Sequence, residues 1–340
     1  SHTEGSTLGV NTTVANANYI LTRSRTGVWS ALGTGIAANV VPYDTISAIV
    51  RHPNGTFYVV GGYIGAGTAT LAQSAAIWTP STGLWSNVKS ATAFNSAVRC
   101  VVVGPDGIVY FGGDFTNVDG IAAADGIVVY DPVANTFAAL GTGVAAGGVV
   151  RALAFDQSGN LYAGGAFTLM GGVANTVRIA KWNGAVWSAM GTGASSNNVL
   201  ALCVVGDTVF AGGTFGLMGG VADTVRLAQW SISGAAWSAM STGANSDVNV
   251  INPYPGSIVF IGGGFTTIGG QSFSRAATWN GVGFSSVGGT SALNSSVNDA
   301  SLSPSGVITV GGSFTTVDGI TYPSNTAQIN GGQYSPLGII

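Results

Sequence analysis

The chain has 340 residues, of which 46% are apolar and only 7% are charged, and its formal net charge is -3. This composition excludes an intrinsically disordered chain, which combines high charge with low hydrophobicity. It also argues against nucleic-acid binding, because Lys89 and Lys181 are the only lysines and no cluster of cations can displace phosphate counterions.

The residue types favour strands and turns. Glycine accounts for 54 residues, about twice its usual share of roughly 7%. Thr, Val, Ser and Asn are abundant, whereas Glu4 is the only glutamate. The chain is longer than the roughly 250–300 residues at which one hydrophobic core usually stops growing. We therefore expect either two domains or one domain built from repeats. No stretch approaches the roughly 20 apolar residues that span a bilayer, so we expect no membrane insertion.

The first elements of the chain are the least regular. Residues 1–17 are interpreted as an N-terminal extension, and residues 19–32 as a hairpin that contains Trp29. The hairpin resembles the end of each later repeat, but no glycine pair precedes it. The chain therefore begins part-way through a repeat.

A glycine pair followed within two residues by an aromatic residue then recurs at intervals of 48–52 residues. The pairs are Gly61-Gly62, Gly112-Gly113, Gly164-Gly165, Gly212-Gly213, Gly262-Gly263 and Gly311-Gly312. They are not a nucleotide-binding fingerprint, which requires a following helix. Glycine instead allows close backbone approach, and we expect each pair to end a strand. A period of this length predicts a repeat architecture.

The third complete repeat illustrates the expected strands. They are predicted at residues 149–155, 161–163, 178–182 and 185–190. Between the last two, Asn183-Gly184 predicts a type I′ turn, since both residues tolerate positive φ. Four short strands per repeat predict a propeller blade, because a single sheet cannot bury both of its apolar faces alone.

The sequence therefore predicts one all-β domain at residues 18–340, a β-propeller of four-stranded antiparallel blades. The count we favour is seven blades with the first one incomplete. The alternative is six blades, with the N-terminal hairpin packed outside the ring or against an edge. The expected units are a partial one at 18–33, followed by 34–88, 89–141, 142–191, 192–241, 242–288 and 289–340.

The repeat resembles the kelch repeat. Residues 127–137 (IVVYDPVANTF) match its strand ending in Tyr-Asp-Pro and its following aromatic position, where Phe137 replaces the usual tryptophan. The closest likeness is to degenerate repeats of the type GG-x-F-T…W-N-G…W-S-A-L-G in secreted bacterial proteins and phage virion proteins. The resemblance covers nearly the whole chain. It implies a propeller fold and a location outside a cell or on a virion, but no particular function, because propellers host many functions.

Three arginines each precede a tryptophan by four residues. Because alternate residues of a strand share a face, we expect each arginine and its tryptophan to lie on one face. Each arginine is interpreted either as a donor to carbonyl groups between blades or as part of an anion or glycan site, and each tryptophan as an inter-blade contact or a sugar-stacking platform. The candidate ligand-binding residues are Arg178, Arg226, Arg275, Trp182, Trp230 and Trp279.

A calcium site is the alternative interpretation of the sequence DFTNVDG, which supplies oxygen ligands from Asp114, Asn117 and Asp119. Ordinary turn chemistry is the interpretation we favour, because Asp119-Gly120 aligns with glycine pairs in other repeats. We therefore predict neither a metal nor another cofactor. Cys100 and Cys203 lie in apolar runs and are predicted to be buried free thiols, with a disulfide as the alternative.

No catalytic set is visible. The histidines, His2 and His52, lie in an expected tail and loop, so no Ser-His-Asp arrangement is predicted. We expect a non-enzymatic binding or structural module, extracellular or on a virion surface, such as a phage tail component or an adhesin. Its expected partners are a receptor, a glycan or a neighbouring subunit. The alternatives are a polysaccharide hydrolase or lyase with two carboxylates on the axis, and a purely architectural subunit.

Overall fold

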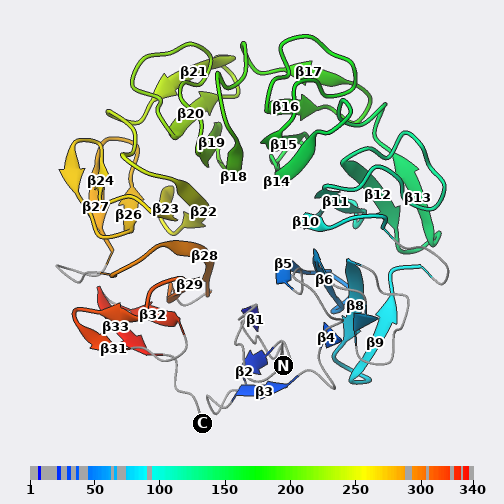
Figure 1. Ribbon diagram of the computed structural model, residues 1–340, viewed down its shortest axis with the longest axis horizontal. Helices are drawn as coiled ribbons and strands as arrows, with labels where there is room; N and C mark the ends of the chain where they lie inside the picture. Colours follow the sequence, from blue (N-terminus) through cyan, green and yellow to red (C-terminus); the bar gives the residue numbers. More distant parts are fainter. Residues whose placement is uncertain are drawn as a thin grey trace.

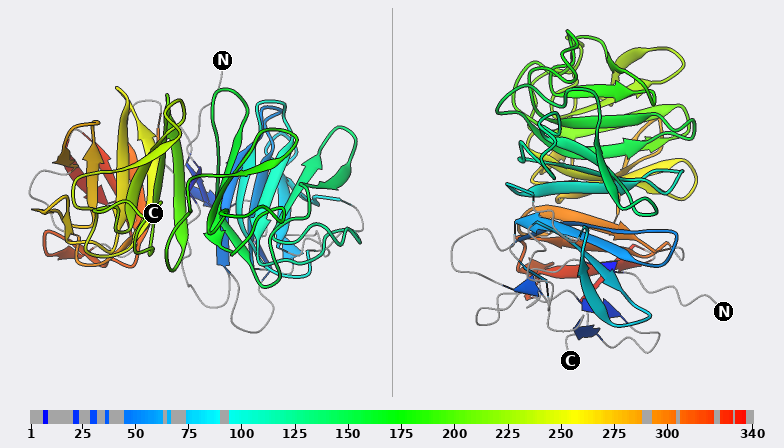
Figure 2. Two further views of the ribbon diagram at one scale, coloured as in Figure 1. Left: turned by 90° about the horizontal axis from the view of Figure 1, so that it is seen from above. Right: turned by 90° about the vertical axis from the view of Figure 1, so that its right-hand side faces the viewer.

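The chain is folded entirely from β-strands in the part that the structure describes. This computed structural model describes residues 45–62, 65–66, 74–89, 94–287, 293–303, 306–321, 325–330 and 332–336, and the backbone of four short strands nearer the N-terminus. Six four-stranded antiparallel sheets stand around a central axis and form a β-propeller (Figures 1 and 2). The predicted fold class is confirmed. No helix able to cross a bilayer occurs in these residues.

Each four-stranded sheet is one blade, and its strands, here named A to D, follow chain order from the axis outward (Figure 1). Blade 1 contains β5 (Thr45–Arg51), β6 (Phe57–Gly62), β8 (Ala75–Thr79) and β9 (Leu84–Asn87). Blade 2 contains β10 (Val98–Val103), β11 (Val109–Gly113), β12 (Ile127–Asp131) and β13 (Thr136–Ala139). Blade 3 contains β14 (Val149–Phe155), β15 (Leu161–Ala166), β16 (Ile179–Trp182) and β17 (Trp187–Ala189).

The second half of the ring repeats this order. Blade 4 contains β18 (Val199–Val205), β19 (Thr208–Gly213), β20 (Leu227–Ser231) and β21 (Ala236–Ala239). Blade 5 contains β22 (Val248–Tyr254), β23 (Ile258–Gly263), β26 (Ala276–Trp279) and β27 (Phe284–Ser286). Blade 6 contains β28 (Val297–Leu302), β29 (Ile308–Gly312), β32 (Thr326–Asn330) and β33 (Gln333–Pro336).

Short two-stranded ribbons lie in the loops between strands B and C. They pair β24 (Thr267–Ile268) with β25 (Gln271–Ser272), and β30 (Thr316–Val317) with β31 (Ile320–Thr321). In blade 1, β7 (Gly65–Ala66) of this loop pairs with β4 (Ile36–Ala37), which precedes the blade. The B–C loops and the connections between blades therefore share one face of the ring, here called the B–C face.

The described residues form six complete four-stranded blades, a count that the sequence prediction allowed. The predicted N-terminal hairpin contributes β2 (Leu21–Arg23) and β3 (Trp29–Ala31), which pair with each other, and β2 also pairs with β1 (Thr7–Leu8). This three-stranded sheet lies in the ring between blade 6 and blade 1, with β1 toward the axis (Figure 1). The remaining residues of the predicted extension and hairpin lie outside the described part.

Blade 3 corrects several local predictions. Its fourth strand, Trp187–Ala189, is shorter than the predicted 185–190. The first strand has the predicted bounds, but the second continues through Gly164-Gly165 to Ala166 because both glycines pair with strand A. A Cβ on Gly164 would lie 2.5 Å from Val199 Cγ1 of blade 4, so glycine allows the next blade to approach. The Asn183-Gly184 turn is not type I′, since only Gly184 has positive φ (95°). Asn183 Oδ1 instead accepts hydrogen bonds from the backbone N–H groups of residues 185 and 186.

Neighbouring blades pack through apolar faces. Four positions of each blade point to the next blade: two on strand A, one on strand B and one on strand C. In blades 2 to 4 these positions hold Cys100, Val102, Tyr110 and Ile127, then Ala152, Ala154, Tyr162 and Ile179, then Ala201, Cys203, Phe210 and Leu227. In blade 5 they hold Val250, Asn252, Phe260 and Ala276.

Blade 6 differs, because the same four positions are polar. They hold Asp299, Ser301, Thr309 and Thr326. By this register they point to the side where the N-terminal sheet lies (Figure 1). Blade 1 presents the usual apolar side chains to the same sector, including Val59, Ala76 and Trp78. The N-terminal sheet therefore lies between one apolar wall and one polar wall.

Candidate ligand-binding site

The three candidate arginines directly precede strand C of blades 3, 4 and 5 and have an unusual backbone conformation. Arg178, Arg226 and Arg275 have φ of 64°, 62° and 72°, in the left-handed region. The backbone N–H of Arg178 donates to Phe167 O (2.9 Å), and its carbonyl accepts from Gly165 N–H (3.0 Å). This pairing closes the B–C loop onto the end of strand B. An arginine here is not part of the strand, so the expectation that Arg178 shares a strand face with Trp182 is wrong.

Other blades place different residues in this conformation. The equivalent residues are Ser74 (φ 62°), Gly126 (67°) and Asn325 (54°). Glycine and asparagine adopt the left-handed region readily, whereas a long side chain there costs about 1–2 kcal/mol. Arginine is therefore not the residue that the backbone prefers at this position, and its side chain must offset the strain or serve another purpose.

Two of the guanidinium groups bridge neighbouring blades. Arg178 Nη1 donates to Ala194 O (3.0 Å) and Arg226 Nη1 donates to Ala244 O (3.2 Å), and both carbonyls belong to the connection into the next blade. Arg275 Nη1 donates to Gly264 O of its own blade. The first of the two sequence interpretations, donation to carbonyls between blades, therefore describes Arg178 and Arg226.

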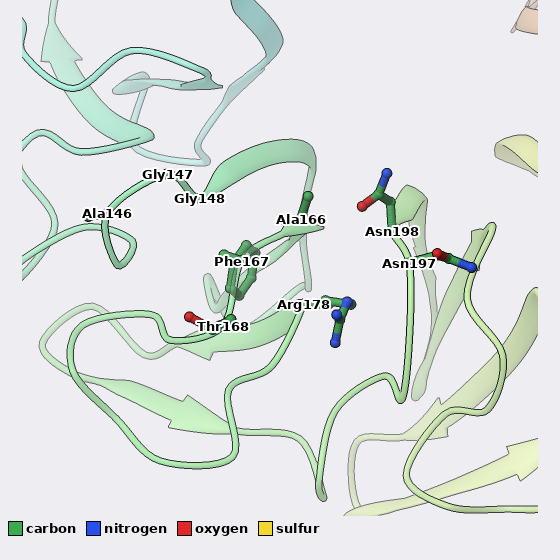
Figure 3. A pocket seen from close by; sticks show the side chains of 9 residues that line it. All are labelled: Ala146, Gly147, Gly148, Ala166, Phe167, Thr168, Arg178, Asn197 and Asn198. Carbon is green, nitrogen blue, oxygen red and sulfur yellow. The ribbon is translucent and has the colours of Figure 1, made fainter.

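Arg178 also lines a pocket on the B–C face. The pocket has a volume of about 290 Å³ and opens between blade 3 and the connection into blade 4 (Figure 3). Figure 3 places the Arg178 side chain between Phe167 and Thr168 of blade 3 on one side and Asn197 and Asn198 on the other. The remaining lining residues are Ala146, Gly147, Gly148 and Ala166. The lining thus contains one cation, hydroxyl and amide groups, and no carboxylate.

The candidate tryptophans do not line this pocket. Trp182 and Trp187 contact each other at 5.3 Å between ring centroids, and Trp230 packs against Trp237 at the same distance. Trp279 packs against Phe284 at 4.6 Å. Trp230 and Trp279 are buried, so neither offers an open face for sugar stacking.

The strand D tryptophans of blades 3 and 4, Trp187 and Trp237, also link their blade to the preceding one. Trp187 Nε1 donates to Leu140 O (3.0 Å), and Trp237 Nε1 donates to Met190 O (2.8 Å). In both cases the acceptor belongs to the end of the previous blade. Trp187 and Trp237 therefore link neighbouring blades.

The three candidate calcium ligands are engaged by protein groups. Asp114 accepts hydrogen bonds from Arg99 Nε (2.9 Å) and Nη2 (2.5 Å), and Asp119 forms an ion pair with Lys89. Asn117 Oδ1 accepts from Gly120 N–H (3.0 Å), as in an ordinary turn. No group of three or more His, Cys, Asp or Glu side chains with metal-binding geometry occurs in the described part of the chain.

Two further aspartates stabilise turns on the opposite face. Asp156 accepts from the backbone N–H groups of Ser158 and Asn160 and from Tyr162 Oη. Burial alone would raise the pKa of Asp156, but these hydrogen bonds together lower it. Hydrogen bonds from Ser233 and Ser231 lower the pKa of Asp207 in the same way. Both carboxylates are therefore held as anions by turn residues.

His52 has a similar local role. Its Nε2 lies 2.9 Å from Gly107 O of blade 2, and its Nδ1 accepts from Asn54 N–H (3.2 Å). The proton on Nε2 is therefore donated to a carbonyl group. His52 fastens the A–B turn of blade 1 to that of blade 2, while His2 lies outside the described residues.

Cys100 and Cys203 are free and buried, which confirms the favoured interpretation of the two thiols. Comparisons of the sequence with protein-family models and with curated proteins find no match. The propeller fold is therefore established by the structure, and the kelch resemblance stays a prediction from the repeat pattern.

Sequence reasoning found Arg178 but missed the pocket and the groups opposite it. Asn197 and Asn198 lie in the connection into blade 4, about 20 residues after Arg178, and no periodic pattern marks them. An alignment of the six repeats contains one usable signal. It places Arg178, Arg226 and Arg275 with Gly126 and Asn325, which indicates positive φ.

Proposed function

We propose that this propeller is a non-enzymatic binding module, exposed outside a cell or on a virion surface, that recognises its partner through the B–C face. The single observation that carries the proposal is the pocket in which Arg178 lies beside amide and hydroxyl groups of two neighbouring segments. This pocket opens between blade 3 and the connection into blade 4.

Within this function, we favour a glycan as the partner. The lining of the Arg178 pocket combines a guanidinium with the amides of Asn197 and Asn198 and the hydroxyl of Thr168. These groups supply both donors and acceptors, which suit sugar hydroxyls. Its volume of about 290 Å³ is at the lower end of the roughly 300–1,000 Å³ of small-molecule sites, so it suits one sugar unit.

The absence of catalysis is part of the proposal. Glycoside hydrolysis needs two carboxyl groups about 5–9.5 Å apart. The Arg178 pocket is lined by none, and Asp156 and Asp207 are committed to turns on the other face. These features support a site that holds a sugar without cleaving it.

A glycan array probed with the intact chain tests the function. We expect binding to one class of glycans, abolished by Arg178→Asn, with no shortened products after prolonged incubation. Release of cleaved products would replace the binding module with the polysaccharide hydrolase or lyase. No binding to any glycan, together with capture of a defined protein subunit through the same face, would favour the architectural role.

A further inference from the structure

The repeats provide an internal comparison for the Arg178 pocket. In blade 2, Arg99 on strand A forms a two-point ion pair with Asp114, which directly follows the glycine pair of strand B. Blade 3 keeps the arginine, as Arg151, at the same position beside the bulge of strand A. The residue equivalent to Asp114 is Ala166, which lines the pocket. Blade 3 therefore keeps the cation and lacks the carboxylate.

A second carboxylate is also missing from blade 3. In blade 4, Asp247 lies in the connection into blade 5, and its Oδ1 is 3.9 Å from Arg226 Nε. The equivalent residue beside Arg178 is Asn198, since Thr214 N–H donates to Asn198 O as Gly264 N–H donates to Asp247 O. An amide thus replaces the carboxylate that faces the arginine of the neighbouring blade.

Blade 3 consequently has two arginines without a protein anion. Among the described residues, neither Arg151 nor Arg178 has a carboxylate within 4.0 Å, whereas Arg99 and Arg226 each have one. The Nε atoms of Arg151 and Arg226 are both buried without a hydrogen-bond partner, and Arg151 does not line the pocket. Of the two blade 3 arginines, Arg178 is therefore the one that an anion in the pocket can reach.

We propose that the pocket between blades 3 and 4 binds the carboxylate of an acidic sugar, which takes beside Arg178 the position that the side chain of Asp247 occupies beside Arg226 in blade 4. The proposal rests on the glycan-binding function above and names the sugar class. The carboxylate accepts hydrogen bonds from the free N–H groups of Arg178, and the hydroxyls of the sugar ring contact Asn197, Asn198 and Thr168. Carboxylates pair well with guanidinium groups because the two planar groups match.

The test compares two sugars that differ only in the charged group. We expect D-glucuronate to shift NMR signals of residues around Arg178 in the intact chain, and D-glucose at the same concentration to shift none of them. The affinity for glucuronate should fall by at least tenfold in Arg178→Asn. Asparagine is the natural residue at the equivalent position of blade 6, where Asn325 has a φ of 54°, so this variant should fold.

Two further variants sharpen the test. Ala166→Asp introduces the blade 2 carboxylate next to the pocket and should also reduce glucuronate affinity at least tenfold, with an unchanged melting temperature. Val186→Ser is the control, because Val186 is exposed in the C–D turn of the same blade and does not line the pocket, and glucuronate affinity should stay within twofold of the parent value.

The outcomes separate this proposal from the general function. Equal affinity for glucose and glucuronate, or full affinity in Ala166→Asp, overturns the carboxylate site while glycan binding stands. Tighter binding of N-acetyl-aspartate than of glucuronate overturns the sugar and points to an acidic peptide. Binding of a neutral glycan elsewhere on the ring also overturns the carboxylate site but keeps the binding module.

Discussion

Cys100 in blade 2 and Asp299 in blade 6 occupy the same position of strand A, opposite Gly112 and Gly311, but their surroundings differ. Cys100 is 8% exposed, packs in the cluster shared with blade 3 and lies 3.9 Å from Val150 O. By its register Asp299 points to the side of the N-terminal sheet, and burial there raises the pKa of its carboxyl to about 6. Blades 1 to 5 therefore pack against the next blade through a mostly apolar face, whereas the corresponding face of blade 6 is polar.

Exchanging the two residue types should have opposite effects. Cys100→Asp places a carboxylate between blades 2 and 3 without a partner, and we expect a loss of more than about 3 kcal/mol in the free energy of unfolding. Asp299→Val installs the residue of blade 5 and should be neutral or stabilising. Urea unfolding followed by circular dichroism measures both. Equal losses in the two variants would show that blade 6 is packed like the others.

The repeat pattern predicted most of the fold, because the pattern itself arises from the need to bury the apolar faces of the strands. The strand Val149–Phe155 was predicted with correct bounds, since an apolar run followed by a turn leaves little freedom. The polar face of blade 6 could also be read from the repeats, as Asp299 replaces apolar residues of other blades. The N-terminal sheet was harder, because its strands carry no glycine pair and its blade is not complete.

The site was less predictable, because it depends on backbone conformation and on contacts between blades. The period-two argument paired Arg178 with Trp182, but a φ of 64° removes Arg178 from the strand. The glycine pair ends strand B in five of the six blades, as expected, but the sequence did not show that it also admits a side chain of the next blade. Neither the left-handed conformation nor the partner of a side chain in another blade is encoded in local periodicity.

The glycine pairs give a second test of the contact between blades. A Cβ on Gly164 would lie 2.5 Å from Val199 Cγ1, whereas the nearest described atom to a Cβ on Gly311 is Thr326 Cγ2 at 3.9 Å. We therefore expect Gly164→Ala to destabilise the fold by about 1–3 kcal/mol through overpacking, and Gly311→Ala to be tolerated. Thermal melting distinguishes the two. Partial recovery in Gly164→Ala with Val199→Ala would confirm the steric cause.

Thiol reactivity reports the burial of the two cysteines in solution. Burial raises the pKa of Cys203 to about 12 and raises the pKa of Cys100 as well, so both thiols are protonated and covered at pH 8. We expect both to react with an aromatic disulfide reagent at least a hundredfold more slowly than in urea. Rapid reaction of either thiol in the folded chain would contradict its burial between blades.

The turn around Asp156 predicts how stability depends on pH. Its hydrogen bonds lower the pKa of Asp156 below the ordinary value of 3.8, so its contribution is present above about pH 4. The contribution is lost as the pH falls through the lower pKa of the folded state. Asp156→Asn should therefore be less stable than the parent at pH 7, by about 1–3 kcal/mol, and the two should converge near pH 2. Tyr162→Phe, which removes only one of the hydrogen bonds, should show a smaller difference with the same pH trend. Urea unfolding at several pH values measures this, and a difference that stays constant down to pH 2 would exclude the carboxylate as its source.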